Sequence, residues 1–179
     1  MSDSQPLVAL VTGASRGIGC AIADTLIQEK LIVIGTATTE AGAASIDARL
    51  APQGGAGLVL DVANEASIDA LMNTVKERFG APLILVNNAG ITRDNILMRM
   101  KADEWDSVID TNLSSVFRLS KACLRGMTKA RWGRIVTITS VVGSMGNAGQ
   151  ANYAATKAGA EGFTRALARE VGLSLIHIS

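Results

Sequence analysis

The sequence lacks the residues that mark metal-binding, disulfide-rich and membrane-spanning proteins. It has 2 cysteines and 1 histidine among 179 residues, which is too few for a disulfide framework or a zinc site. We predict no metal site, and we expect Cys20 and Cys123 to be small buried hydrophobes. Residues 1–6 lack the basic and apolar regions of a signal peptide, and no run of about 18 apolar residues occurs. We therefore predict a cytoplasmic protein without a membrane segment.

The sequence also lacks an excess of charge of either sign. Lysine and arginine number 17 and aspartate and glutamate 16, for a net charge of +1. Such a balance gives no reason to expect nucleic acid or an anionic membrane as a partner. With 48% hydrophobic residues, the chain is long enough to bury one substantial core.

Short apolar runs alternate with stretches of helical periodicity. This order is typical of an α/β protein with a doubly wound parallel sheet of the Rossmann type. The expected strands are residues 7–11, 31–35, 57–60, 83–86 and 134–139. The expected helices are residues 17–29, 40–50, 65–79, 102–129 and 152–171.

A glycine run follows the first expected strand and opens the first expected helix. Gly13 and Gly17 remove side chains from the turn, and Gly19 lets the helix pack closely on the sheet. Backbone N–H groups at a helix N-terminus attract a pyrophosphate, so the run predicts a dinucleotide site. Taken alone, the run fits an ordinary tight turn equally well.

Tyr153 and Lys157 lie one helical turn apart, and Tyr153 is the only tyrosine in the chain. A free tyrosine has a pKa of about 10, and a neighbouring ammonium favours the phenolate that acid–base chemistry needs. Ser140 follows the last expected strand. There its hydroxyl can hydrogen-bond the oxygen of a substrate carbonyl or alcohol held against the Tyr153 phenol. The alternatives are a solvated helix face for the pair and a strand-end cap for Ser140.

These motifs together resemble the short-chain dehydrogenase/reductase family. The similar segments are residues 12–19 (TGASRGIG), 87–90 (NNAG) and 153–157 (YAATK), together with Asn112 and Ser140, within a likeness that spans residues 7–172. The resemblance implies a nicotinamide-dependent oxidoreductase. Its implied catalytic residues are Asn112, Ser140, Tyr153 and Lys157.

The end of the second expected strand indicates which nucleotide is used. No carboxylate is present there until Glu40, whereas Arg16 lies in the glycine loop and Thr38 follows the strand. Arginine and hydroxyl groups suit a 2′-phosphate, so we predict NADP(H) rather than NAD(H). The alternative is that Arg16 is a solvated loop charge.

Further cofactor-binding residues are implied by the resemblance alone. Asp61 and the backbone of Val62 are expected to border the adenine, and the turn at residues 87–90 to pack beside the cofactor. The whole implied set is Gly13, Ser15, Arg16, Gly17, Ile18, Gly19, Thr38, Asp61, Val62, Asn88, Ala89, Gly90, Tyr153 and Lys157. Asn112 is expected to hold a water that links Lys157 to solvent; its alternative is a helical polar residue bonded to a backbone carbonyl.

Residues 90–100 and 140–153 resemble family members that reduce 3-oxoacyl thioesters on an acyl-carrier protein in bacterial fatty-acid synthesis. The implied partner is therefore an acyl-carrier protein that carries a 3-oxoacyl thioester. Another ketone such as acetoacetyl-CoA, or a non-catalytic dinucleotide-binding module, stays open.

Two groups of residues bear on that partner. Lys129, Arg131 and Arg134 form either a basic dock or a solvated helix end. Four residues border either an acyl channel or the core: Met98, Met100, Val142 and Met145.

Residues 173–179 (LSLIHIS) depart from the family pattern. They are what a transposon-end sequencing adapter would encode, so we predict a reductase domain at 1–172 that is incomplete at its C-terminus, followed by a non-native tail. We expect the longer parent to form a homotetramer, and this fragment to be at most a dimer with weak or no activity. We also expect residues 134–139 to form an open apolar edge.

Overall fold

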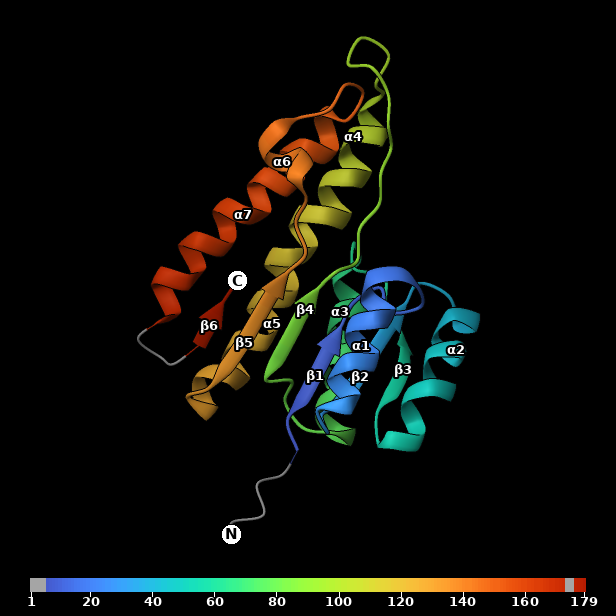
Figure 1. Ribbon diagram of the computed structural model, residues 1–179, viewed down its shortest axis with the longest axis vertical. Helices are drawn as coiled ribbons and strands as arrows, with labels where there is room; N and C mark the ends of the chain where they lie inside the picture. Colours follow the sequence, from blue (N-terminus) through green and yellow to red (C-terminus); the bar gives the residue numbers. More distant parts are fainter. Residues whose placement is uncertain (1–5, 173–175) are drawn as a thin grey trace.

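The computed structural model describes residues 6–172 and 176–179 and contains one parallel sheet. Its strand order is β3-β2-β1-β4-β5-β6 (Figure 1). All five strand pairs are parallel, so the predicted doubly wound fold is confirmed. The strands are β1 (Val8–Val11), β2 (Ile32–Ala37), β3 (Ala56–Val59), β4 (Ile84–Asn87), β5 (Gly133–Thr137) and β6 (Ile176–Ile178).

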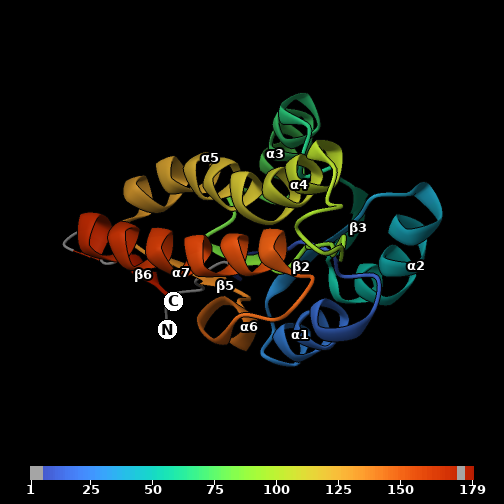
Figure 2. The same ribbon diagram turned by 90° about the horizontal axis from the view of Figure 1, so that it is seen from above.

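Helices cover both faces of this sheet. Figure 2 shows α3, α4, α5 and α7 on one side and α1, α2 and α6 on the other. Their bounds are α1 (Gly17–Gln28), α2 (Glu40–Leu50), α3 (Glu65–Arg78), α4 (Ala102–Ile109), α5 (Ser115–Ala130), α6 (Val141–Met145) and α7 (Ala151–Val171). A 3₁₀ turn, Ala51–Gln53, follows α2, and a π-helical turn, Asp110–Ser114, joins α4 to α5.

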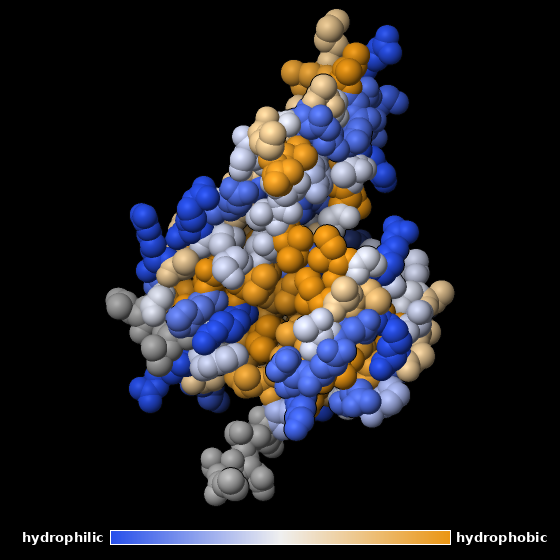
Figure 3. All heavy atoms as spheres, viewed as in Figure 1, coloured by the Kyte–Doolittle hydropathy of each residue, from blue (hydrophilic) through white to orange (hydrophobic). Residues whose placement is uncertain are grey.

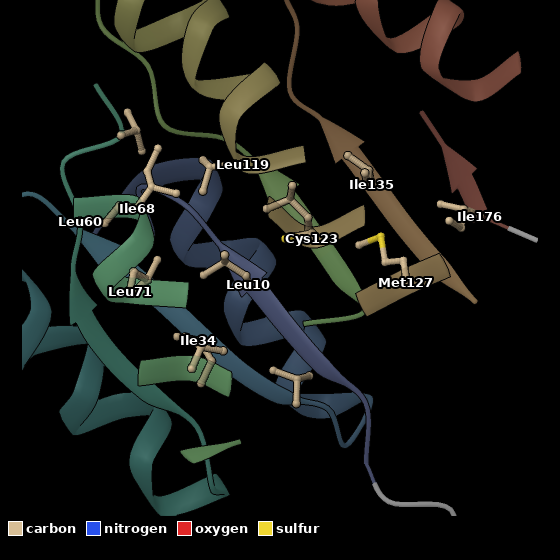
Figure 4. Close-up of a cluster of buried hydrophobic side chains, with 14 of the residues drawn as sticks. Leu10, Ile34, Leu60, Ile68, Leu71, Leu119, Cys123, Met127, Ile135 and Ile176 are labelled. Atoms are coloured by element: carbon tan, nitrogen blue, oxygen red, sulfur yellow. The ribbon is translucent and has the colours of Figure 1, made fainter. Parts of the chain in front are cut away.

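The strands are apolar on both faces because helices pack on both faces. All four residues of β1 are buried. Leu10 belongs to the apolar cluster under α3, α5 and α7, which Figure 4 shows, whereas Ala9 belongs to the cluster under α1 and α2. Cys123 is 1% exposed in the first cluster, and burial raises the pKa of its thiol to about 12. Cys123 is thus the buried hydrophobe that was predicted; Cys20 is only half-buried.

The sheet has a sixth strand where the sequence predicted about five. Ile176 and Ile178 alternate with His177, and Ile176 is 1% exposed in the same apolar cluster as Ile135. The Ser179 N–H donates to the Ile135 carbonyl at 2.8 Å, and the Thr137 N–H donates to the Ser179 carbonyl at 2.7 Å. The edge of β5 is therefore paired, and the prediction of an open edge was wrong.

Apolar side chains are instead exposed on one face of the sheet. Figure 3 shows an apolar area over β5 and beside α1. The exposed large apolar residues on these elements and on the adjacent α6 are Ile18, Val136, Val141 and Met145, at 62%, 36%, 74% and 83% of their areas.

The strand order reverses direction between β1 and β4. The chain leaves β1 toward β2 on one side, and later enters β4 on the other side. In sheets of this kind the crevice outside the carboxyl ends of such strands is where ligands bind. The glycine loop after β1 and residues 88–90 after β4 meet at this crevice. Among the helices in the described ranges, none is long and apolar enough to cross a bilayer.

Truncation of Leu10 tests the core. Leu10 is 0% exposed, so we expect Leu10→Ala to lower the free energy of unfolding by about 3 kcal/mol through lost burial and a cavity. Leu97, at 72% exposed, supplies the matched control. Leu97→Ala should change the free energy of unfolding by less than about 0.5 kcal/mol. Urea denaturation of the two variants measures both values, and equal effects would contradict this core assignment.

Candidate active site

The glycine loop between β1 and α1 has backbone angles that favour glycine. Gly13 and Gly17 have φ angles of +65° and +59°, in the left-handed region that favours glycine. A Cβ on Gly19 would lie 2.3 Å from the Gly13 oxygen and 2.4 Å from Asn88 Nδ2, so this position admits no side chain. The N-terminus of α1 has no side-chain cap and no acidic residue in its first turn. Its N–H groups are free to face an anion.

Asn88 holds the loop from the side of β4. Its Nδ2 donates to the carbonyls of Thr12 and Gly13, at 2.9 and 3.1 Å. The buried Thr12 Oγ1 accepts from the N–H groups of Asn88 and Ala89, both at 3.0 Å. Asn88 and Ala89 thus contact the glycine loop itself. The structural role of Thr12 was missed, although a hydroxyl directly after a buried strand is a usable signal.

The remaining predicted cofactor residues lie at the carboxyl ends of β1, β2 and β3. Ser15, Arg16, Thr38 and Asp61 are exposed there, and so is Ile18 at the start of α1. Asp61 Oδ1 accepts from the Ala63 N–H at 3.0 Å, which closes a tight turn.

Val62, next to Asp61, is only 5% exposed and packs in the core. The Val62 side chain is therefore part of the core, and the expectation that its backbone borders the adenine stays a prediction.

Lys157 is a buried cation at the centre of the proposed catalytic set. It is 6% exposed, and its Nζ donates to the Ile138 carbonyl at 2.7 Å. The same Nζ lies 5.5 Å from the centre of the Tyr153 ring. Burial lowers the pKa of Lys157, since a charged group is less well solvated there than in water. The pair predicted from its i, i+4 spacing is therefore side by side on α7.

Ser140 lies in the segment between β5 and α6. Its Oγ accepts from the Val142 N–H at 3.2 Å and caps α6, a helix that the sequence did not predict. A Cβ on Gly143 would lie 2.9 Å from Ala158 N and 3.1 Å from Lys157 Cβ. This close packing brings α6 and its cap against the turn of α7 that carries Lys157.

Asn112 is buried in the π-helical turn between α4 and α5. Its Oδ1 accepts from the Ile91 N–H and its Nδ2 donates to the Ile91 carbonyl, both at 2.8 Å. A Cβ on Gly90 would lie 3.3 Å from Asn112 Oδ1, so the loop after β4 lies directly against Asn112. The Asn112 side chain therefore binds a backbone carbonyl, which was the alternative to a role in holding water. The π turn interrupts a helix predicted as continuous, and such turns are frequent at functional sites.

Two loops lie side by side beyond the catalytic set. The Asn95 N–H donates to the Gly149 carbonyl at 2.8 Å, and Asn152 Nδ2 donates to the Arg93 carbonyl at 2.9 Å. Met98 and Met145, close to these contacts in the chain, are 96% and 83% exposed. Core packing of these two methionines, one of the sequence readings, was therefore wrong.

The three cations expected to form either a basic dock or a solvated helix end lie away from Ser140 in this chain. Lys129 and Arg131 are at the end of α5, and Arg134 is at the start of β5. Ser140 follows the opposite end of that strand, which spans roughly 16 Å (Figure 1). Closeness in sequence did not give closeness in space, because the extended strand β5 separates these cations from Ser140. Within one chain, these cations do not flank Ser140.

Comparison with known proteins gives a consistent set of similarities. The family described as short chain dehydrogenase matches residues 7–179. The 3-oxoacyl-[acyl-carrier-protein] reductase FabG of Pseudomonas aeruginosa is 63% identical over 177 residues, which are 98% of this chain and 72% of the relative. The proteins of the same name from Salmonella typhimurium and Escherichia coli are 63% and 62% identical over 164 residues, 92% of this chain and 67% of each relative.

A substitution that adds a Cβ at Gly19 tests how closely this residue packs against the glycine loop. Gly19→Ala should lower the free energy of unfolding by more than about 1 kcal/mol, because its Cβ meets a carbonyl oxygen and an amide that are both held in place. Gly162→Ala on α7 is the matched control, since a Cβ there has nothing within 4 Å. That change should be neutral or stabilising. Urea denaturation measures both, and a neutral Gly19→Ala would show that the loop is not closely packed.

The burial of Lys157 predicts a pH dependence of stability. Because burial lowers the pKa of Lys157, the unfolded chain keeps this proton at pH values where the folded chain has lost it. The free energy of unfolding should then rise with pH between the folded pKa and the ordinary lysine value of about 10.4.

We expect this rise in the wild type relative to Lys157→Met, measured by urea denaturation at several pH values from about 7 to 10. Lys76→Met, which changes an exposed lysine of α3, is the matched control. A wild-type minus Lys157→Met difference that stays flat over this range would contradict the burial of the cation.

Proposed function

Because this chain belongs to the short-chain dehydrogenase family, we propose that it is an oxidoreductase that reduces the 3-oxoacyl group of an acyl-carrier-protein thioester to the 3-hydroxyacyl group. We propose NADPH as its reductant. The printed names of relatives at 62–63% identity support the substrate class. The exposed Arg16 and Thr38 at the carboxyl ends of β1 and β2 support the 2′-phosphorylated nucleotide.

One observation carries the catalytic part of the proposal. Lys157 Nζ contacts the Ile138 carbonyl at 2.7 Å and lies over the Tyr153 ring. This contact joins the helix that carries Tyr153 to the segment that carries Ser140. The contact supports the proposal that the proton donor, the cation and the hydroxyl act on one carbonyl, as acid–base catalysis requires.

NADPH, when bound, supplies the hydride that adds to the carbonyl carbon. The residues of this chain supply the rest. The Tyr153 hydroxyl donates its proton to the oxygen that gains charge, and the Lys157 ammonium stabilises the phenolate left behind. The Ser140 hydroxyl donates a hydrogen bond to the same oxygen and orients the carbonyl. Asn112, whose side chain is held by Ile91, keeps α4 and α5 against the loop after β4, and we propose that its turn holds the water that returns a proton to Lys157.

The glycine loop suits a dinucleotide because its backbone is closely packed and the N–H groups that follow it are open. Gly13 and Gly19 leave no room for side chains where the loop meets Asn88, and the open N-terminus of α1 supplies N–H donors. Met98 and Met145, both exposed, are proposed to border the acyl chain. A cytoplasmic location, a tetrameric parent, and weak activity of the 179-residue fragment stay predictions. So does the adapter origin of residues 173–179, which genomic sequence across residue 172 checks.

The assay of this proposal follows NADPH oxidation with acetoacetyl-carrier protein as substrate. It uses the 179-residue chain and the same chain continued by the remaining residues of the Pseudomonas aeruginosa relative. Tyr153→Phe should lower turnover by about 10²–10⁴-fold, because no proton donor remains, while NADPH binding is kept. Glu170→Gln, a change at an exposed position near the end of the same helix, should leave turnover unchanged.

The outcomes separate the candidate functions. Full activity of Tyr153→Phe would refute the assigned proton donor. Turnover of acetoacetyl-CoA but not of the carrier-bound substrate would move the proposal to another ketone. NADPH binding without any turnover would favour a non-catalytic dinucleotide-binding module, and tighter binding of NADH would refute the nucleotide assignment.

A further inference from the structure

Arg49 lies outside the proposed catalytic set, yet its side chain reaches the glycine loop from α2. Its Nη2 donates to the Ala14 carbonyl at 3.0 Å. Its Nη1 donates to Cys20 Sγ at 3.0 Å and forms an ion pair with the Asp24 carboxylate. Cys20 and Asp24 belong to α1, so one guanidinium joins α2, α1 and the loop that connects β1 to α1.

The N–H and the carbonyl of Ala14 are both hydrogen-bonded. It is 0% exposed, and its N–H donates to the Thr36 carbonyl at 2.8 Å. Asn88 already binds the carbonyls of Thr12 and Gly13, so the first three carbonyls after β1 are each bound by a side chain. Arg49 supplies the last of these three contacts.

The carbonyl that Arg49 binds determines where the next amide points. A peptide group is planar and trans, so the C=O of Ala14 and the N–H of Ser15 point in opposite directions. Ser15 is exposed at the crevice, close to the start of α2, where a Cβ on Gly42 would lie 3.9 Å from Ser15 Cβ. With the Ala14 carbonyl bound by Arg49, the Ser15 N–H points away from the guanidinium.

We propose that Arg49 is a positioning residue that sets the glycine loop for dinucleotide binding by orienting the Ala14–Ser15 peptide. This inference rests on the proposed function for its ligand, and on the contacts of Arg49 for its mechanism. Arginine suits the task because its two terminal nitrogens bind Ala14 and the α1 side chains at once, which a lysine ammonium does with poorer geometry. Asp24 balances the charge.

The ordinary alternative is an ion pair between two helices that stabilises the fold and nothing else. The Arg49 and Asp24 side chains are 31% and 48% exposed, and exposed pairs contribute little to stability. The two readings differ in what they predict for the loop. A merely structural pair leaves dinucleotide affinity and loop protection unchanged, whereas a positioning residue changes both.

The experiment compares Arg49→Met and Arg49→Lys with the wild type. Hydrogen exchange is followed at residues 13–19 without any nucleotide, and the Kd for NADPH is measured by fluorescence titration. Arg165→Met is the matched control, because Arg165 pairs with Glu161 on α7 with 70% of its side chain exposed. Asp24→Asn is a second variant that removes the carboxylate and keeps the Ala14 contact.

We expect Arg49→Met to weaken NADPH binding about tenfold, the effect of losing a charge-assisted hydrogen bond at a partly exposed site. The Ser15 amide should exchange faster, and KM for NADPH should rise with little change in kcat. Arg49→Lys should fall between Arg49→Met and the wild type, Asp24→Asn should be milder than Arg49→Met, and Arg165→Met should match the wild type.

A lower melting temperature of Arg49→Met with unchanged loop exchange and Kd would overturn the inference. If the wild type binds no nicotinamide dinucleotide, the proposed function fails, while the exchange data still decide whether Arg49 orders the loop. If Arg49→Met does not fold, Arg49→Lys and Asp24→Asn carry the same comparison, and wild-type exchange and affinity in both would refute the positioning role.

Discussion

The site depends on hydrogen bonds that join β1 to β4 at the point where the strand order reverses. Thr12 and Asn88 exchange contacts across this junction, and each comes directly after a buried strand. They bind the carbonyls of Thr12 and Gly13, and without them these carbonyls would lack a side-chain donor. Because the junction is formed by residues 76 positions apart, the proposed cofactor-binding half of the site is available only after the sheet has formed.

The proposed catalytic half depends on a second constraint, the burial of a cation. Lys157 is 6% exposed and bonds the Ile138 carbonyl. Burial lowers its pKa, and the bond fixes α7 against the segment after β5. Taking an ammonium out of water costs stability. This cost falls on the residue that joins the Tyr153 helix to the segment before Ser140, and buried charged groups with a shifted pKa are frequent at functional sites.

Prediction from sequence succeeded where local pattern decides structure. The apolar runs gave five strands near their observed positions, and the spacing of Tyr153 and Lys157 placed both on one face of α7. It failed where distant contacts decide. The helix α6 is too short to show periodicity, the π turn at Asn112 depends on contacts with Ile91, and Lys129 and Arg134 are close in sequence but lie at the far end of β5 from Ser140.

The sequence by itself determined the fold class, the position of the glycine loop and the placement of Tyr153 and Lys157 on one helix face, because these follow from short-range spacing and residue chemistry. Tertiary structure alone decided that Asn88 and Arg49 hold the loop from two sides, that Ile176 and its neighbours pair with β5, and that Met98 and Met145 are exposed. The physical reason is that hydrogen-bond partners and solvent exposure depend on which distant segments the folded sheet brings together.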